Sequence, residues 1–459
     1  MDRTEQLGKE RIPVLLLRFS VPAITGMLVQ ALYNVVDRIF VGRGVGANGI
    51  AGLTLVFPVM LVIMAFSILI GLGATALISI RLGEGKRDEA ERILSTAAVM
   101  LAINAAVISV VGLVFLDPLL RLLGASDAIL PYARDYLSVI FYGTVFQSVS
   151  FGMNHCIRAE GNPRRAMSTM LIGAILNTIL DPIFIFWFGW GVTGAAVATV
   201  ISQVASFIWV MWYFVAGRSA VRFRLRGIRV ELPALLKIIS IGFAPFSMQL
   251  AASLLNLILN RSLAHYGGDL AISGMGIVYS INTIFMMPIF GINQGVQPII
   301  GFNFGARQYG RVKEALRLGI AAATGVVTLG WITTRLFPLQ LISLFGREDV
   351  ELFSQAGRAM RIGLSFLPIV GFQVVGASYF QAVGKPKKAA FLSLSRQLLL
   401  LVPAVLIIPR FLGLDGIFIS LPVADVGSSL LTALLLVKEM RELKLGQPDP
   451  AGRTERSTV

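Results

Sequence analysis

The sequence predicts an all-α polytopic membrane protein, with about twelve transmembrane helices in two parallel six-helix repeats. Its composition is not that of a soluble globular protein, because 56% of the 459 residues are hydrophobic, 14% are charged and the mean hydropathy is +0.78. Apolar stretches long enough to span a membrane recur from end to end, whereas a membrane barrel would show short alternating segments. Prolines, glycines and short motifs of the first half have counterparts 222–223 residues later in the chain.

The apolar stretches define twelve approximate spans joined by short loops. The first stretch is interpreted as a retained span and not as a signal peptide, because it has no small-residue cleavage site and contains Pro22. Glycine-rich outer turns are expected at 42–49 and 189–194. The spans are 12–40, 50–79, 93–116, 131–157, 166–189, 193–216, 235–262, 271–299, 314–337, 358–382, 389–409 and 415–437.

The internal repeat divides the chain into two halves of six spans each. Pro22 corresponds to Pro245, and EGNPRRA at 160–166 corresponds to VGKPKKA at 383–389. Because six is an even number, both halves enter the membrane in the same orientation, as in the parallel repeats of secondary transporters. The expected domains are an N-terminal lobe at 1–216, a basic cytoplasmic linker at 217–234, a C-terminal lobe at 235–437 and a polar, disordered tail at 438–459.

The formal charge of +15 follows the membrane topology. Of the 40 Lys and Arg residues, 29 fall in the N-terminus, the even-numbered loops and the C-terminal tail. This asymmetry is the positive-inside rule, and it predicts that both termini lie in the cytoplasm. A nucleic-acid partner is therefore not expected. The five arginines of the linker are interpreted as topology anchors that contact anionic lipid.

The first span ends in QALYNVVDRIFVG, which places Asn34, Asp37 and Arg38 inside the hydrocarbon or at its edge. A carboxylate held there costs on the order of 2.5–3.5 kcal/mol, so membrane helices rarely keep one without a function. In the fifth span Asp181 lies at a matching depth, and Asn177 is on the same helix face four residues earlier. Thr199 of the sixth span is at a comparable level.

These oxygen-bearing side chains predict a cation or proton site in the outer part of the N-terminal half. Oxygen-only ligation suits a hard cation such as Na⁺, and two close carboxylates make a proton carrier equally plausible. The alternative is that Asp37 pairs with Arg38 and that Asp181 caps or kinks its helix beside Pro182. The repeat partners of the two acids are Asn260 and Ala404, so the site belongs to one half only.

Asp425, near mid-depth of the last span, has two interpretations. It attracts a cationic substrate or assists proton release, or it pairs with Arg396 or another span. Other polar and methionine side chains suit an adaptable cavity, although each alone is as well explained by helix packing. With Asp425, the predicted cavity residues are Gln30, Met153, Asn154, Gln203, Gln249 and Met286.

Pro22 and Pro245 are expected to kink the first and seventh spans, because proline removes a backbone hydrogen bond. A kinked helix that carries a titratable acid is a natural two-state element, and a static kink is the alternative. The pattern GxGxxG at 44–49 lies in an outer loop without the strand that a dinucleotide site needs. There is no Walker lysine motif, HExxH or GxSxG, so neither an ATP-driven pump nor an enzyme is expected.

Cysteine and histidine chemistry is nearly absent from the chain. Cys156 is the only cysteine, so no intramolecular disulfide and no cysteine metal cluster is expected. The two histidines, His155 and His265, are not in a spacing that indicates a metal site. No cofactor is predicted beyond a coupling ion, H⁺ or Na⁺.

Taken together, the motifs resemble the multidrug and toxic compound extrusion (MATE) family, in its MepA/DinF-like branch. The resemblance covers roughly residues 10–440 and rests on YNVVDRIFVG after the span 1 proline, RLGEGK after span 2, EGNPR after span 4 and NTILDP in span 5. It implies a V-shaped central cavity between two lobes, a cation or proton site at Asp37, Asn177, Asp181 and Thr199, and bending at Pro22. The C-lobe acids of NorM-type members have no counterpart in the seventh span.

The sequence thus predicts a monomeric secondary antiporter that exports amphipathic organic cations and other xenobiotics in exchange for H⁺ or Na⁺ through alternating access. The alternative is a flippase for a lipid-linked oligosaccharide or peptidoglycan precursor of the same superfamily. A flippase is expected to line its cavity with arginines for the pyrophosphate, but only Arg261 and Arg396 lie inside spans away from an end. A channel would conduct without stoichiometric exchange, and a membrane enzyme would need a catalytic constellation that the sequence does not show.

Overall fold

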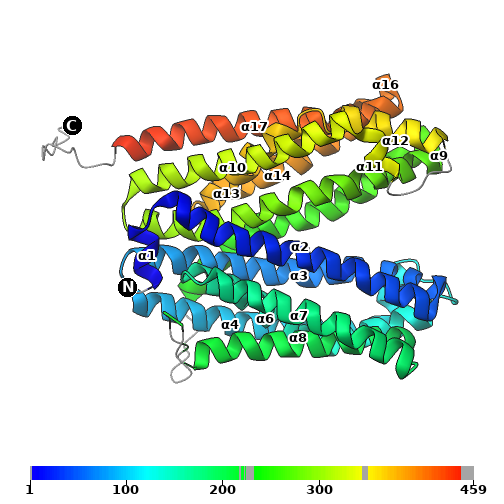
Figure 1. Ribbon diagram of the computed structural model, residues 1–459, viewed down its shortest axis with the longest axis horizontal. Coiled ribbons are helices and arrows are strands. Elements are labelled where there is room, and N and C mark those ends of the chain that lie inside the picture. Colours follow the sequence, from blue (N-terminus) through cyan, green and yellow to red (C-terminus); the bar gives the residue numbers. More distant parts are fainter. Residues whose placement is uncertain (1–2, 217–218, 222, 224–231, 344–349, 446–459) are drawn as a thin grey trace, which may run out of the picture.

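The computed structural model describes residues 3–216, 219–221, 223, 232–343 and 350–445. Throughout this part of the chain the regular elements are helices, most of them parallel to the long axis of the molecule (Figure 1). The helices of the first half are α1 (Arg3–Lys9), α2 (Ile12–Val45), α3 (Ala47–Gly83), α4 (Arg87–Val114), α5 (Leu116–Leu122), α6 (Leu130–Ala159), α7 (Pro163–Pro182), the π-helix η1 (Ile183–Trp187) and α8 (Gly191–Val215).

The second half begins with α9, in which two spans follow each other with a break at Gly268. Gly268 has φ 63° and ψ −162°, a conformation that a residue without a side chain adopts readily. The helices of this half are α9 (Leu232–Gly305), α10 (Tyr309–Leu336), α11 (Pro338–Ser343), α12 (Val350–Gly363), α13 (Leu367–Ala382), α14 (Pro386–Leu394), the π-helix η2 (Ser395–Leu401), α15 (Val402–Ile407), α16 (Pro409–Leu412) and α17 (Leu414–Leu445).

Each predicted span coincides with one helix or with a short series of consecutive helices, except that α9 holds two spans. In the described part of the chain, ten helices are long and apolar enough to cross a membrane. An eleventh span is formed by α12 and α13, which are bent by 52° relative to each other. The remaining predicted span, 131–157, corresponds to α6, which is not among these helices; its 30 residues include Arg134, Asp135 and Arg158, and it packs against α3, α4 and α8. The predicted fold class is therefore confirmed.

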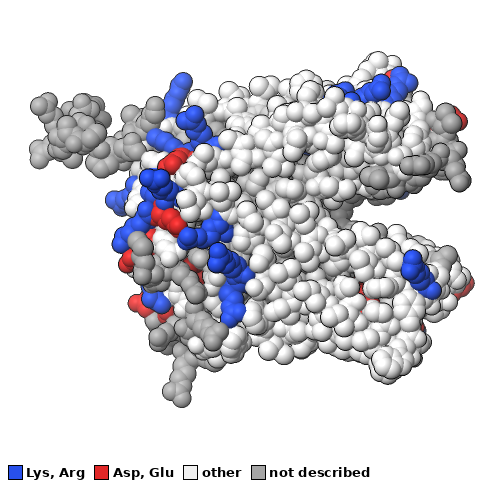
Figure 2. Space-filling view, in the orientation of Figure 1, with Lys and Arg blue, Asp and Glu red and all other residues white. Residues whose placement is uncertain are grey.

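The two halves lie side by side and diverge toward one end of the molecule. Figure 1 shows α2 to α8 below and α10 to α17 above, with α1 and the C-terminal end of α17 at the same end of the bundle. Figure 2 shows a hollow between the halves at the opposite end, which we call the outer hollow. Lys and Arg side chains gather at the end that carries the termini, the basic end (Figure 2).

At the basic end the halves are closed by direct contact between α3 and α9. A Cβ atom added at Gly83 would lie 1.9 Å from the carbonyl oxygen of Phe302, and one at Gly305 would lie 2.1 Å from that of Ile80. Because Gly83 and Gly305 are equivalent in the repeat, each half offers the same glycine to the other. Only a residue without a side chain permits this approach of two helix backbones.

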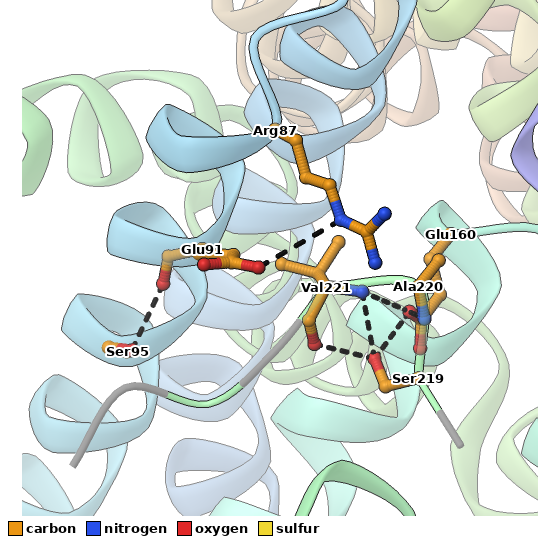
Figure 3. A network of polar contacts seen from close by, with 7 residues as sticks. All are labelled: Arg87, Glu91, Ser95, Glu160, Ser219, Ala220 and Val221. Atoms are coloured by element: carbon orange, nitrogen blue, oxygen red, sulfur yellow. Dashed lines mark hydrogen bonds and ion pairs between the residues drawn. The ribbon is translucent and has the colours of Figure 1, made fainter. Parts of the chain in front are cut away.

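A segment ahead of each half packs on the other half. Leu7, before the first span, is fully buried in the core of the second half, and the Arg311 guanidinium donates to the carbonyls of Leu7 (3.0 Å) and Glu10 (2.6 Å). Conversely, the linker residue Val221 is buried in the core of the first half. Glu160 holds this linker through bonds from Ser219 and two backbone N–H groups (Figure 3).

Three local predictions need correction or lie outside the described residues. The predicted outer turn at 42–49 is helical except at Gly46, where φ is 85°, because α2 continues to Val45 and α3 begins at Ala47. The first part of the predicted disordered tail, 438–445, continues α17, and Glu439 is buried there between Lys385 and Lys388. Most of the linker, at 217–218, 222 and 224–231, and the end of the tail, at 446–459, lie outside the described residues.

Candidate functional site

The two predicted acids are both buried in the first half, toward the end with the outer hollow. Asp37 is 7% exposed and lies eight residues before the end of α2, about 12 Å along the helix axis. Asp181 is fully buried near the end of α7, which runs in the same direction. Their carboxyl groups lie within hydrogen-bonding reach of each other. The structure therefore places the two acids in one cluster.

Asn177 connects this cluster to the neighbouring helix. Its side-chain amide donates to Asp181 Oδ1 at 3.2 Å and to the Thr199 hydroxyl of α8 at 3.2 Å. Asn177 and Thr199 are 2% and 3% exposed. Hence α2, α7 and α8 each contribute a side chain, and we call Asp37, Asn177, Asp181 and Thr199 the N-half polar cluster.

Two tyrosines complete the cluster. Tyr33 and Tyr136 lie close to Thr199 and to the carboxyl groups of Asp37 and Asp181. Tyr33 is four residues before Asp37 and so shares its helix face, a signal that the sequence offered. Tyr136 comes from α6, and no spacing in the sequence indicated that α6 reaches this cluster.

The alternatives for each acid are resolved in part. Asp181 is not a helix cap, because its carboxylate bonds Asn177 within the same helix. The helix then changes at Pro182 into the π-helix η1, a rare element that is frequent at functional sites. The side chains of Asn34 and Arg38 lie outside the described residues, so their predicted roles remain predictions.

The cluster has the chemistry to hold a hard monovalent cation. Asn177 Oδ1 and Asp181 Oδ2 are buried oxygens that have no hydrogen-bond partner among the residues that the structure describes. Such oxygens, with the Thr199 hydroxyl and Asp37, suit Na⁺. A proton is the other occupant that fits, because two carboxyl groups in contact repel each other unless one is neutralised. Among the described residues, no group of three or more His, Cys, Asp or Glu side chains forms a metal site.

In the second half, Asp425 is bound to Arg396. The guanidinium Nε and Nη2 lie 2.8 Å and 2.7 Å from Asp425 Oδ1. Of the two interpretations of Asp425, the structure therefore supports the pairing. Both residues lie near mid-depth, and Arg396 is part of the π-helix η2.

The other predicted cavity residues divide into two groups. Met153 is fully buried in the first-half core, and the Asn154 amide donates to the Ala166 carbonyl at 2.8 Å, so both contribute to packing and not to an exposed cavity surface. The remaining four have accessible surface and stay candidates; they are Gln30, which is exposed, and Gln203, Gln249 and Met286, which are half-buried.

Pro22 is buried inside α2, which continues unbroken from Ile12 to Val45. Pro245 has the equivalent place inside α9. In this conformation each proline is thus accommodated within a continuous helix, and the bending that the resemblance implies remains a prediction.

The comparisons with known proteins identify the family. The MatE family model matches residues 22–183 and 246–406, one match in each half, as expected for an internal repeat. The chain is 28% identical over 435 residues to the multidrug export protein MepA of Staphylococcus aureus (strain MSSA476), covering 94% of this chain and 95% of MepA.

Two solved structures have the same fold. The MATE multidrug transporter DinF-BH in complex with rhodamine 6G is 38% identical, covers 97% of this chain and 100% of its own, and superposes with a TM-score of 0.89. An outward-facing multidrug resistance MATE family transporter of the MOP superfamily is 27% identical. The match covers 96% of this chain and 98% of that transporter, with a TM-score of 0.90. These matches define a multi-span membrane transporter, and the chain belongs to the MATE family.

Proposed function

We propose that this protein is a secondary antiporter that exports amphipathic organic cations in exchange for H⁺ or Na⁺. The observation that carries the proposal is the N-half polar cluster, in which two buried carboxyl groups lie in contact inside a membrane-spanning half. Intramembrane acids are costly and mark ion pathways and proton relays. The names of the relatives, a multidrug export protein and a multidrug transporter in complex with rhodamine 6G, support the substrate class.

In this proposal the ion and the substrate alternate. The ion neutralises Asp37 and Asp181, Asn177 and Thr199 fix the two carboxyl groups in place, and the buried position excludes bulk water. When Na⁺ is the ion, Asn177 Oδ1 and Asp181 Oδ2 hold it. One inward charge carries roughly 2.3 kcal/mol per 100 mV of membrane potential. That energy corresponds to about a fortyfold concentration gradient of substrate.

The orientation of transport follows from the charge distribution. The basic end is assigned to the cytoplasm by the positive-inside rule, so the outer hollow faces outward (Figure 2). The conformation described is then the one from which a drug leaves and an ion enters. The plasma membrane of a bacterial or archaeal cell is the proposed location, and a monomer the proposed state.

The test is rhodamine 6G efflux from proteoliposomes under a pure H⁺ gradient and then a pure Na⁺ gradient. Wild type is expected to need one of the two, and Asp37→Asn to lose gradient-driven efflux while it remains folded. The control is Asp117→Asn, which removes a half-exposed carboxylate of the same half that pairs with Arg134 at 3.3 Å. Unimpaired efflux by Asp37→Asn would refute the assignment of the site, and no efflux by wild type under either gradient would favour the flippase.

A further inference from the structure

The second half carries a charged pair where the first half has none. By the offset of the repeat, Asp425 corresponds to Gln203 and Arg396 to Gly173. Arg396 lies ten residues after the start of α14, and Asp425 eleven residues after the start of α17. At 1.5 Å per residue, Arg396 lies about 15 Å along its helix from one side of the membrane, and Asp425 lies about the same distance from the other side. A fixed guanidinium at that depth demands an explanation, because few positions in a membrane are more costly for a charge.

The pair faces the interior of the protein and not the lipid. Asp425, Ser428 and Thr432 follow one another at helical spacing on α17, and all three are buried. Arg396 reaches toward this face, yet 28% of its side chain is exposed. Charged side chains at mid-membrane depth face either the protein interior or a water-filled cavity, so the exposed part of the Arg396 side chain is assigned to such a cavity. Arg396 therefore lines a water-accessible space within the transporter.

The ion pair does not use all of its hydrogen-bonding capacity. Both guanidinium contacts, from Nε and Nη2, go to the same oxygen, Asp425 Oδ1. In the described part of the chain, Arg396 Nη1 and Asp425 Oδ2 make no hydrogen bond. Because Asp425 is nearly buried and Arg396 is not, the accessible group is the donor.

The backbone at Arg396 is a second, independent sign of a functional position. Arg396 lies in the π-helix η2 of the eleventh span, and Asp181 lies two residues before the π-helix η1 of the fifth, its repeat equivalent. π-Helical turns are rare and are found mostly at functional sites. Tyr279 of α9 is 37% exposed and is close enough to Arg396 and Asp425 to interact electrostatically with both.

We propose that Arg396, held in place by Asp425, binds a negatively charged group of the transported molecule, such as a carboxylate or a phosphate. This inference rests on the proposed function and names the residue that would bind the anionic group of a zwitterionic substrate. A guanidinium binds carboxylate and phosphate oxygens through directional hydrogen bonds. The N-half polar cluster would then serve the ion, and the Arg396–Asp425 pair the anionic end of the substrate.

The test compares rhodamine 6G, an ester and a cation, with its free carboxylic acid, a zwitterion. Binding of both probes to the full chain in lipid nanodiscs is measured by fluorescence anisotropy. The variant is Arg396→Gln with Asp425→Asn, which removes both charges and retains the shape of the pair. The free acid is expected to bind at least about tenfold more weakly, the lower limit for a hydrogen bond to a charged group. The affinity for the ester is expected to stay within about twofold.

The controls separate this inference from the proposed function and from misfolding. Arg261→Gln removes an exposed arginine of α9 outside the pair and is expected to change neither affinity. Gradient-driven efflux of the ester by the double variant shows that it is folded. An equal loss for both probes, or no loss for the free acid, would overturn the inference while ester efflux leaves the proposed function intact. Failure of wild type to bind or export the ester would instead refute the proposed function.

An anionic lipid headgroup offers the same chemistry as the free acid, and the lipid composition distinguishes the two. In nanodiscs of phosphatidylcholine alone, the free acid is expected to bind as described. If phosphatidylglycerol competes with the free acid in wild type and not in the double variant, the occupant of Arg396 is a headgroup phosphate. If phosphatidylglycerol has no effect, it is the soluble substrate. Both outcomes support an anion site at Arg396.

Discussion

At the scale of single residues, the buried charges of this transporter perform different tasks that their partners define. Asp37 and Asp181 lie against each other, Asp425 lies against a guanidinium, and Glu160 accepts hydrogen bonds from the linker. A buried carboxylate with an arginine partner is neutralised permanently, whereas two carboxylates in contact require an exchangeable ion. The partner thus determines whether an acid can couple transport.

Glu160 responds to pH at the basic end, outside the membrane. It is 1% exposed and accepts bonds from Ser219 (2.5 Å), the Ala220 N–H (2.7 Å) and the Val221 N–H (3.1 Å), next to the Arg87–Glu91 pair (Figure 3). Burial raises the pKa of Glu160 from 4.5 to about 7, although these bonds oppose the shift. The docked linker therefore holds a proton that a released linker would give up.

We expect docking of the linker to weaken as pH rises from about 4.5 to about 7, because the docked state binds the proton more tightly. Docking is strongest below that window and loses roughly 3 kcal/mol across it. The measurement is hydrogen exchange of the 219–221 amides at about pH 5 and about pH 8, corrected for the intrinsic exchange rate. In Glu160→Gln the dependence is expected to vanish, and its persistence there would contradict the assignment to Glu160.

At the scale of helices, the contact of α3 with α9 determines which end of the transporter is closed. The glycines Gly73 and Gly242 repeat the arrangement of Gly83 and Gly305, since Cβ atoms there would lie 2.1 Å and 1.7 Å from the carbonyl oxygens of Ile238 and Leu69. All of these contacts are backbone contacts between the two halves. They stabilise the conformation that is closed at the basic end.

Gly83→Ala and Gly305→Ala are expected to shift the protein toward a conformation open at the basic end. The methyl group forces the two backbones apart at a cost of about 1–3 kcal/mol, or roughly a 5- to 150-fold change in the equilibrium. Spin labels at Lys86→Cys and Lys387→Cys, exposed on different halves, are expected to show a larger population at long distance.

The matched control for these variants is Gly310→Ala. Gly310 is a helical glycine of α10 near the basic end, and a Cβ atom there meets nothing within 4 Å. It is expected to leave the distances between the labels unchanged. Equal distance distributions in Gly83→Ala, Gly310→Ala and the unsubstituted protein would show that the glycine contact does not hold the closed end.

The positions of the helices could be predicted where hydropathy alone determines them. Helix ends that depend on packing could be predicted less well. Long apolar runs predicted the position of every long helix in the described part of the chain, including α6 with its charges, but missed some helix ends by up to eight residues, as at Val350 and Leu445. The predicted outer turn at 42–49 was wrong because its four glycines were interpreted as a loop, although the two helices need only Gly46 to change direction. The helical continuation to Leu445 was missed because polar residues indicated a tail, whereas Glu439 pairs with lysines that precede and begin α14.

The site was predictable from its acids and not from its surroundings. The depth of Asp37 and Asp181 follows from span direction, and the helical spacing of Asn177 brings it to the same face, as the structure has it. Tyr136 was missed because the rotation of α6 depends on contacts with other helices. Met153 and Asn154 were assigned to the cavity for the same reason, because residue type does not reveal which face of α6 is packed.

At the scale of the whole molecule, two similar halves are joined so that each carries a segment that packs on the other. Leu7 is buried in the second half and Val221 in the first. Movement of the halves about the α3–α9 contact must therefore move or release these two segments. In the proposed mechanism, alternating access is a motion of two lobes that these segments connect at the basic end.

The topology itself is testable by labelling. Ser126→Cys, exposed near the outer hollow end, is expected to react with a membrane-impermeant maleimide in intact cells. Lys387→Cys at the basic end is expected to react only after permeabilisation. Cys156 is buried and does not interfere. The opposite pattern would show that the basic end faces outward and would reverse the direction of the proposed export.

The central claim is that substrate and ion compete through the N-half polar cluster. Its most direct test uses purified protein without any gradient. The first measurement is the number of protons released into a weakly buffered solution when rhodamine 6G binds. The second is the effect of Na⁺ on the affinity of the protein for the dye. Wild type is expected to release protons or to bind the dye more weakly as Na⁺ is added, and Asp37→Asn is expected to do neither while Asp117→Asn behaves as wild type. Displacement of the ion by the dye in Asp37→Asn, as large as in wild type, would contradict the account.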